Sequence, residues 1–328
     1  MRIPLRFAIV LLSLPFMISC NKDLNVNADW KDITVVYGLL DQHTDTTFVK
    51  ITKAFLGPGD AMQFAQIPDS SYYPDKLEVL LEEYDGNNLR DSFSLDTITI
   101  HNKEAGDSIF FYPDQLMYYT TAPLNQDYIY RLKIKNRRTG KEITAETGLV
   151  HNFSIDRPQI IASFPPGQTF EVKWEPAKNG KRYQLVIRFL YYESLKTDPQ
   201  NLVLKSVDWT VFNNIKSTEN QVLPFDYYYP GDAFYAVIGS KIPVNPDVTR
   251  SAYRALFLFS VAADDMATYM DVTEPSLSLI QEKPSFTNIT NGIGLFSSRF
   301  VKATDSLALS SITLNELKVN SHTKDLGF

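Results

Sequence analysis

The sequence predicts a mainly β protein composed of two antiparallel β-sandwich domains. Three observations support this fold class. Apolar and polar residues alternate with a period of two in many short segments, no long helical stripe interrupts the first half, and 44% of the 328 residues are apolar. This apolar share is enough for a sizeable core, and the chain length suggests about two domains.

The first predicted domain covers residues 32–150. Residues 47–55 and 76–84 alternate between apolar and polar side chains, as expected for strands with one buried face. Residues 128–149 predict a hairpin that turns at residues 138–141, where a glycine can adopt the positive φ of a tight turn.

The second predicted domain covers residues 151–328 and begins after a break near residues 151–158. Residues 170–175 alternate, and residues 183–189 continue the same pattern after a turn rich in proline and glycine. This domain is therefore predicted to be a second antiparallel sandwich.

Residues 195–249 form a stretch longer than a sandwich needs between neighbouring strands, so we expect an inserted segment there. Within it, residues 231–238 predict a short helix that Asp232 caps, because aspartate is a favourable N-cap. Residues 264–270 predict another short helix.

The first twenty residues have the pattern of an export signal. Arg2 and Arg6 precede an apolar run over residues 7–18, which is too short to span a bilayer. Cys20 directly follows an apolar residue, a spacer and a small residue, an arrangement that resembles the lipobox of bacterial lipoproteins. The resemblance implies cleavage after residue 19, acyl chains such as palmitate on Cys20, and a short tether over residues 20–31.

Composition and charge exclude several classes of function. Cys20 is the only cysteine, so the fold has no intramolecular disulfide, and a lipidated sulfur cannot serve in thiol catalysis or metal binding. Removal of residues 1–19 takes the formal net charge from −6 to −8, which is unfavourable for binding nucleic acid.

The motifs of common active sites are missing from the sequence. The four histidines, at positions 43, 101, 151 and 322, lack the spacing of a local zinc motif, and no Gly-x-Ser-x-Gly sequence occurs. We therefore predict no cofactor, no metal site and no catalytic residue. Pairs of acids such as Asp264 with Asp265, or Glu82 with Glu83, keep open a glycan hydrolase, which needs two carboxylates.

Pairs and triplets of aromatic residues are the main compositional oddity. The triplet Tyr227, Tyr228 and Tyr229 lies between two prolines, which predicts a loop in which three rings cannot all be buried. Tyrosine is enriched at interfaces, so we expect these three residues to contact a glycan or a peptide. Gly292 and Gly294 lack the third glycine of a dinucleotide loop and predict a bulge or a close backbone approach within a strand.

The second domain also carries a more specific resemblance. Its markers are Trp174, a turn at residues 176–180, then Tyr183, Leu185 and Ile187, and later Tyr253 at the head of an apolar run. The first markers are similar to the second and third strands of a fibronectin type III-like sandwich, and Tyr253 is similar to the tyrosine that begins a later strand of that fold. The resemblance implies this fold for residues 151–328.

The whole chain after Cys20 resembles a family as well. The markers are Val35 with residues 38–41, residues 69–73, and the Asn-Ile-x-x-Gly-x-Gly-x-Phe sequence at residues 288–296. They look like lipoproteins of unknown function from Bacteroidota that are often encoded beside TonB-dependent receptors. The resemblance implies an outer-membrane location and a barrel transporter as partner, but no activity and no site residues. The favoured hypothesis is a non-enzymatic, lipid-anchored accessory or binding protein. A lipid-anchored glycan hydrolase is the alternative.

Overall fold

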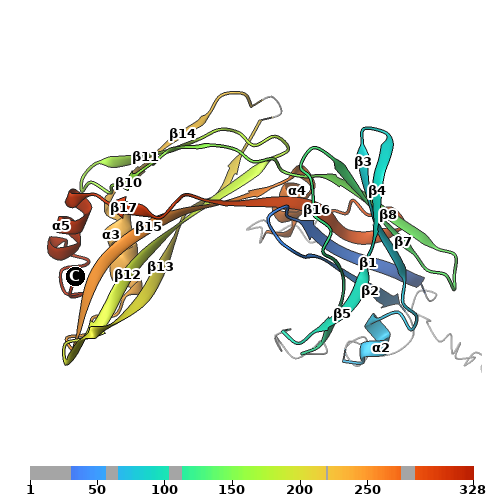
Figure 1. Cartoon of the computed structure of the whole chain (residues 1–328), viewed down its shortest axis with the longest axis horizontal. Coiled ribbons are helices and arrows are strands. Elements are labelled where there is room, and N and C mark those ends of the chain that lie inside the picture. Colours follow the sequence, from blue (N-terminus) through green and yellow to red (C-terminus); the bar gives the residue numbers. More distant parts are fainter. Residues whose placement is uncertain (1–30, 57–65, 103–112, 219–220, 275–284) are drawn as a thin grey trace, which may run out of the picture.

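The protein folds into two β-rich lobes that lie side by side along its long axis (Figure 1). The computed structural model describes residues 31–56, 66–102, 113–218, 221–274 and 285–328. Strands hold 52% of the described residues and helices 12%, which confirms the predicted mainly β fold. Each lobe has its own hydrophobic core, and Leu149 lies in the first core whereas Val150 and Phe153 lie in the second.

The first lobe packs two sheets face to face. One has the strand order β16–β1–β2–β6–β5 and the other β4–β3–β7–β8. Except for β16, which belongs to the C-terminal part of the chain, the elements are β1 (Lys31–Leu40), β2 (Thr47–Leu56), α2 (Pro68–Ser71), β3 (Glu78–Asp85), β4 (Asn88–Ser94), β5 (Asp96–Ile100), β6 (Gln115–Thr120), β7 (Ile129–Lys135) and β8 (Glu142–Gly148).

The hairpin predicted over residues 128–149 is confirmed. Tyr130, Leu132 and Ile134 of β7 are buried, because alternate side chains of a strand point to the same face. The turn between β7 and β8 contains Gly140 at a φ of 70°. The side chain of Asn136 accepts hydrogen bonds from backbone N–H groups within the turn, which fixes its shape.

The second lobe is also a two-layer sandwich. Its smaller sheet has the order β14–β11–β9, and its larger sheet contains β13, β12, β15, the end of β16, β17 and β10. The elements are β9 (Ile155–Arg157), β10 (Ile161–Ala162), β11 (Thr169–Trp174), β12 (Arg182–Leu195), β13 (Asp198–Lys216), β14 (Phe225–Pro230), α3 (Asp232–Lys241), β15 (Val248–Ala262), α4 (Asp264–Thr273), β16 (Gly292–Ala303), β17 (Leu307–Leu309) and α5 (Ser311–Val319).

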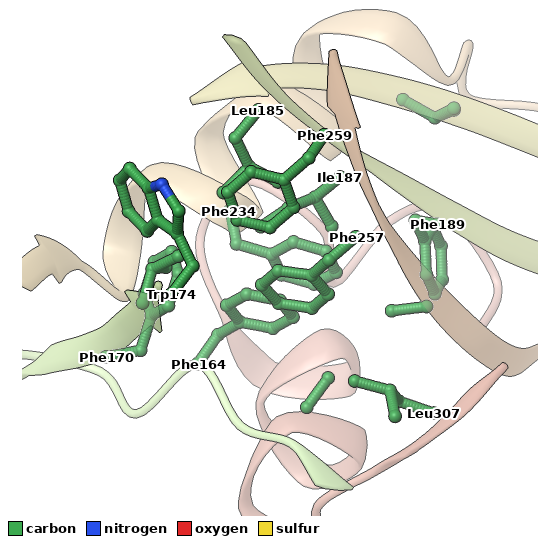
Figure 2. Packing of buried hydrophobic residues seen from close by; sticks show 14 of the residues in the cluster. Phe164, Phe170, Trp174, Leu185, Ile187, Phe189, Phe234, Phe257, Phe259 and Leu307 are labelled. Carbon is green, nitrogen blue, oxygen red and sulfur yellow. The ribbon is translucent and has the colours of Figure 1, made fainter. Parts of the chain in front are cut away.

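Aromatic rings from both sheets and from α3 fill the core of the second lobe (Figure 2). Trp174 of β11 lies 5.8 Å, between ring centroids, from Tyr183 of β12. Phe164 stacks on Phe234 of α3 at 4.1 Å. The strands that carry Trp174 and Tyr183 belong to opposite sheets, as the resemblance to a fibronectin type III-like sandwich implies.

The stretch over residues 195–249 contains the short helix α3, as predicted, together with two strands. β13 pairs with β12 along a long hairpin, and β14 pairs with β11, so each strand completes one sheet of the lobe. Asp232 is not the N-cap, which is Gly231; instead, the Asp232 carboxylate accepts a hydrogen bond from the backbone N–H of Gly167 at 2.8 Å. The second predicted helix is confirmed as α4.

One strand connects the two lobes. β16 pairs in parallel with β1 from Gly292 to Ser298 and then in antiparallel with β15 from Arg299 to Ala303. A Cβ atom on Gly294, whose φ is 119°, would lie 2.0 Å from the carbonyl oxygen of Val36. The predicted close backbone approach at the glycine pair is therefore confirmed.

Candidate functional site

The outer face of the first sheet meets helix α4 in a groove of about 880 Å³. This size lies within the usual range of ligand sites. We call it the junction groove, because it lies on the strands that lead from the first lobe to the second. It is lined by Tyr37, Gly38, Leu39, Asp41, Thr44, Asp45, Thr46, Phe48, Lys50, Met117, Met266, Tyr269, Met270, Leu295 and Arg299.

The floor of the junction groove is formed by side chains of β1 and β2 that point away from the core of the first lobe. Val36 of β1 and Val49 of β2 point into the core and are fully buried. Their neighbours Tyr37 and Phe48 point the opposite way and remain 44% and 37% exposed. Residues 33–40 are almost continuously apolar, and this was a sequence signal for a strand with two apolar faces.

Helix α4 forms one wall of the groove. Met266 and Met270 are four residues apart, so they lie on the same side of the helix. The ring of Tyr269 meets the ring of Tyr37 edge-on at 6.3 Å, and their hydroxyl groups are 3.4 Å apart. The hydrogen bond to Tyr269, together with burial, raises the pKa of Tyr37 to about 12. The Tyr37 hydroxyl group therefore stays neutral at physiological pH.

Polar contacts hold both ends of α4. At its start, the Asn288 amide donates a hydrogen bond to Asp265 at 2.9 Å, and burial raises the pKa of that carboxyl group. At its end, Arg182 of β12 binds Asp271 at 3.1 Å and also binds Glu274. Arg182 is only 3% exposed, so the helix is joined to the second lobe through a buried guanidinium group.

Charged residues also line the groove. The carboxylate of Asp41 accepts a hydrogen bond from the backbone N–H of His43 at 3.1 Å and forms an ion pair with Arg299 at 3.5 Å. Arg299 also lines a second hollow, of about 280 Å³, that shares Met266 and Met270 with the junction groove. The two hollows therefore flank α4, with the methionines between them.

The structure changes the interpretation of the three tyrosines predicted to bind a ligand. Tyr227, Tyr228 and Tyr229 lie on strand β14, so the prediction of a loop is wrong; Pro230 is the last residue of the strand. Tyr227 stacks on Trp174 at 5.7 Å, and Tyr229 meets Phe170 at 5.9 Å.

Tyr228 points to the opposite face of this sheet and is 60% exposed. The three rings therefore do not form one contact surface, and none of them lines the junction groove. Cys20, the predicted site of lipidation, lies outside the described residues.

The acid pairs named from the sequence have structural partners. Glu82 forms an ion pair with Lys133 at 2.9 Å, and Glu83 accepts a hydrogen bond from the hydroxyl group of Tyr130 at 2.7 Å. These two side chains leave β3 on opposite faces, because they are neighbours on a strand. Asp265 binds Asn288, and neither it nor Asp264 lines the junction groove.

Two kinds of feature are absent from the described part of the chain. None of its helices is long and apolar enough to cross a bilayer. Within the same residues, no group of three or more histidine, cysteine, aspartate or glutamate side chains is placed to hold a metal ion.

Comparisons with known proteins give no family. The sequence matches no protein-family model and no curated protein. Among solved structures, one match is the C-terminal globular domain of an oligosaccharyltransferase from Pyrococcus abyssi, with 10% identity and a TM-score of 0.24. The match covers 70% of this chain but only 47% of the other, so the chain spans about half the length of that protein. A likeness this low establishes neither a shared fold nor a shared function.

Proposed function

We propose that this protein is a lipid-anchored, non-enzymatic binding protein of the outer membrane, and that its junction groove binds a polypeptide segment of a barrel transporter. The observation that carries the proposal is the chemistry of the groove. Its walls combine three methionines, Met117, Met266 and Met270, with the rings of Tyr37, Phe48 and Tyr269.

Methionine-rich surfaces suit apolar side chains of varied shape, because an unbranched thioether adapts to its partner. Tyrosine and phenylalanine add large contact areas at a small cost in conformational entropy. By contrast, a sugar needs many hydrogen-bonding groups around an aromatic platform. Here Asp41 and Thr44 to Thr46 gather at the turn between β1 and β2, and Asp41 is already engaged with Arg299. The groove chemistry therefore favours a polypeptide over a glycan.

The anchoring part of the proposal rests on the N-terminal sequence and on the direction of β1. The export pattern and Cys20 support lipid attachment. β1 runs parallel to β16, which leads into the second lobe, so the start of β1 lies at the end of the first lobe that is remote from the second. On this proposal the membrane is next to the first lobe, and the second lobe projects away from it.

A site-specific photo-crosslinker tests the proposal. A photoreactive amino acid at position 117, in the groove, is expected to form an adduct in living cells that mass spectrometry identifies as an integral β-barrel protein. The matched control places the same amino acid at position 319, which is 69% exposed on α5 in the second lobe. Adding Tyr37→Glu to the position-117 protein should greatly reduce the adduct, since a buried charge opposes apolar contact.

Two results would count against this function. One is the absence of a barrel adduct from position 117; the other is an equal yield from position 319. Shortening of a polysaccharide by the purified protein, abolished by Asp45→Asn, would favour the glycan hydrolase, because Asp41 and Asp45 both line the groove.

A further inference from the structure

We propose that the β7–β8 turn, residues 135–141, is a docking surface for the anionic headgroups of a phospholipid bilayer. This inference rests on the proposed lipid anchor. It adds a second contact with the membrane, made by the folded protein itself.

The turn lies at the same end of the molecule as the start of β1. Thr34 of β1 is opposite Gly292 of β16. The neighbouring Asn291 donates a side-chain hydrogen bond to the carbonyl group of Glu142 at 3.0 Å, at the start of β8. Thr144 and Thr290 are joined by backbone hydrogen bonds as well. In Figure 1 the β7–β8 turn and the start of β1 lie at the right-hand end, whereas α5 and the C terminus lie at the left-hand end.

The charge of the turn is opposite to that of the chain. Four of its seven residues, Lys135, Arg137, Arg138 and Lys141, are basic, although the whole chain has a net charge of −6. Arg137 forms an ion pair with Glu78 at 3.0 Å, yet its side chain remains 78% exposed. Lys135 and Arg138 are exposed too. A basic cluster of this kind is attracted to a surface of lipid phosphates.

Hydrogen bonds within the turn define its backbone shape. The Asn136 side chain accepts hydrogen bonds from the backbone N–H groups of Arg138 and Thr139. The backbone N–H of Gly140 donates to the carbonyl group of Asn136 at 2.8 Å. The basic side chains are therefore presented from a hydrogen-bonded backbone, and such preorganisation limits the entropy lost on docking.

The anchor would keep this surface near the membrane. Ten residues separate Cys20 from Lys31, and ten residues cannot span more than about 36 Å. The start of β1 therefore stays within about that distance of a lipid attached to Cys20, and the basic turn lies at the same end of the first lobe. Each basic residue close to an anionic surface strengthens binding about fivefold.

Vesicle binding tests the surface without the lipid anchor. The mature chain with Cys20→Ala is mixed with vesicles of phosphatidylcholine, alone or with phosphatidylglycerol, and bound protein is measured by sedimentation. We expect binding to the anionic vesicles only, and weaker binding at high salt. The double variant Lys135→Gln, Arg138→Gln should bind about 25-fold more weakly, since it loses two such contacts.

The matched control removes two exposed charges at the opposite end of the molecule, with Lys318→Gln and Lys324→Gln, and should bind like the parent protein. Equal binding by the two double variants, or equal binding to neutral vesicles, would overturn the proposal. Unchanged thermal unfolding of both variants would show that any difference is not a folding defect. Because the tested protein carries no lipid, failure here is distinct from failure of lipid attachment at Cys20, which is measured by metabolic labelling.

Discussion

Gly38 of β1 and Phe296 of β16 are opposite each other in the parallel strand pair, and a Cβ atom on Gly38 would lie 2.9 Å from Cδ2 of the Phe296 ring. Phe296 is fully buried, and its backbone N–H and carbonyl groups both bind the side chain of Asn288. The two sequence markers near the ends of the chain, residues 35–41 and 288–296, thus form one packed unit. The close approach of β1 to β16 depends on small residues at this contact.

Substitution of Gly294 should be strongly destabilising. In Gly294→Ala the new Cβ would lie 2.0 Å from the carbonyl oxygen of Val36, at a φ of 119° that L residues rarely adopt. We expect a loss of about 3 kcal/mol or more in the free energy of unfolding, measured with a chemical denaturant. Gly86→Ala is the control, because Gly86 also has a positive φ, of 57°, but no atom lies within 4 Å of its Cβ position. Gly86→Ala should lower the free energy of unfolding by about 1 kcal/mol. Equal losses for the two variants would disprove the importance of the close approach at Gly294.

A fragment that ends at Val150 should fail to fold. It lacks β16, so β1 loses its parallel partner, and the first core loses Ile289 and Phe296. We expect an aggregated or loosely packed product without a cooperative unfolding transition. Fusing residues 285–298 to this fragment through a flexible linker should restore cooperative unfolding. Cooperative unfolding of the fragment alone would show that the first lobe is independent of β16.

Removing the two carboxylates that pair with Arg182 should lower the free energy of unfolding more than removing Arg182 itself. Arg182 is 3% exposed, whereas Asp271 and Glu274 are 38% and 48% exposed. The double variant Asp271→Asn, Glu274→Gln leaves a buried guanidinium group without its counter-ions, which should cost about 3–5 kcal/mol of unfolding free energy. Arg182→Met leaves carboxylates that water can reach and should cost less. A larger loss for Arg182→Met would contradict this account.

We expect the free energy of unfolding to fall at acid pH, because Glu193 loses its charge there. Lys205 and Arg250 bind its carboxylate and hold the pKa of Glu193 below its ordinary value. A lowered pKa in the folded state contributes stability above the unfolded pKa of about 4.3, and this contribution is lost as the pH falls through the folded value. Glu193→Gln should therefore lower the unfolding free energy at pH 7, because it breaks a pair with the buried Arg250. The difference in unfolding free energy between the parent protein and the Glu193→Gln variant should become smaller below about pH 4.3. A difference that does not depend on pH would exclude this role of Glu193.

The lipid anchor has a direct test. Cys20→Ala should abolish incorporation of labelled fatty acid and leave an unprocessed or soluble product, since the sulfur is the proposed attachment point. Unchanged acylation of this variant would disprove the anchor. Protease treatment of intact cells then reports which side of the membrane carries the protein: digestion only after lysis would place it inside.

The local pattern of apolar and polar residues predicted the strands in which buried and exposed side chains alternate. The strand with Tyr130, Leu132 and Ile134 and the helix α4 were both found from sequence, and for the strand a periodicity of two was sufficient. β13 was missed because its first nine residues are all exposed, so no alternation marks them. β14 was mistaken for a loop because Pro224 precedes it and Pro230 is its last residue, although proline is tolerated at the end of an edge strand.

The junction groove could be predicted only in part. Tyr37 lies on a segment that is almost continuously apolar, whereas Phe48 lies on one whose alternation predicted a strand with a single buried face. Their meeting with Met266 and Tyr269 depends on the pairing of β1 with β16, which joins residues more than 250 positions apart. Nothing in a local sequence window specifies such a contact. The glycines at 292 and 294 indicated a close approach but could not name the strand that approaches.

The parallel pairing of β1 with β16 has a mechanical consequence. Seven residue pairs, from Thr34 opposite Gly292 to Leu40 opposite Ser298, join the two strands. Tension between the start of β1 and the second lobe would pull the strands in opposite directions along their length. Such a load shears all of the interstrand hydrogen bonds together instead of opening them one at a time, so rupture requires a high force and is governed by the unfolding rate. A protein held at its N terminus could thus transmit a pull on its far lobe without coming apart at the joint.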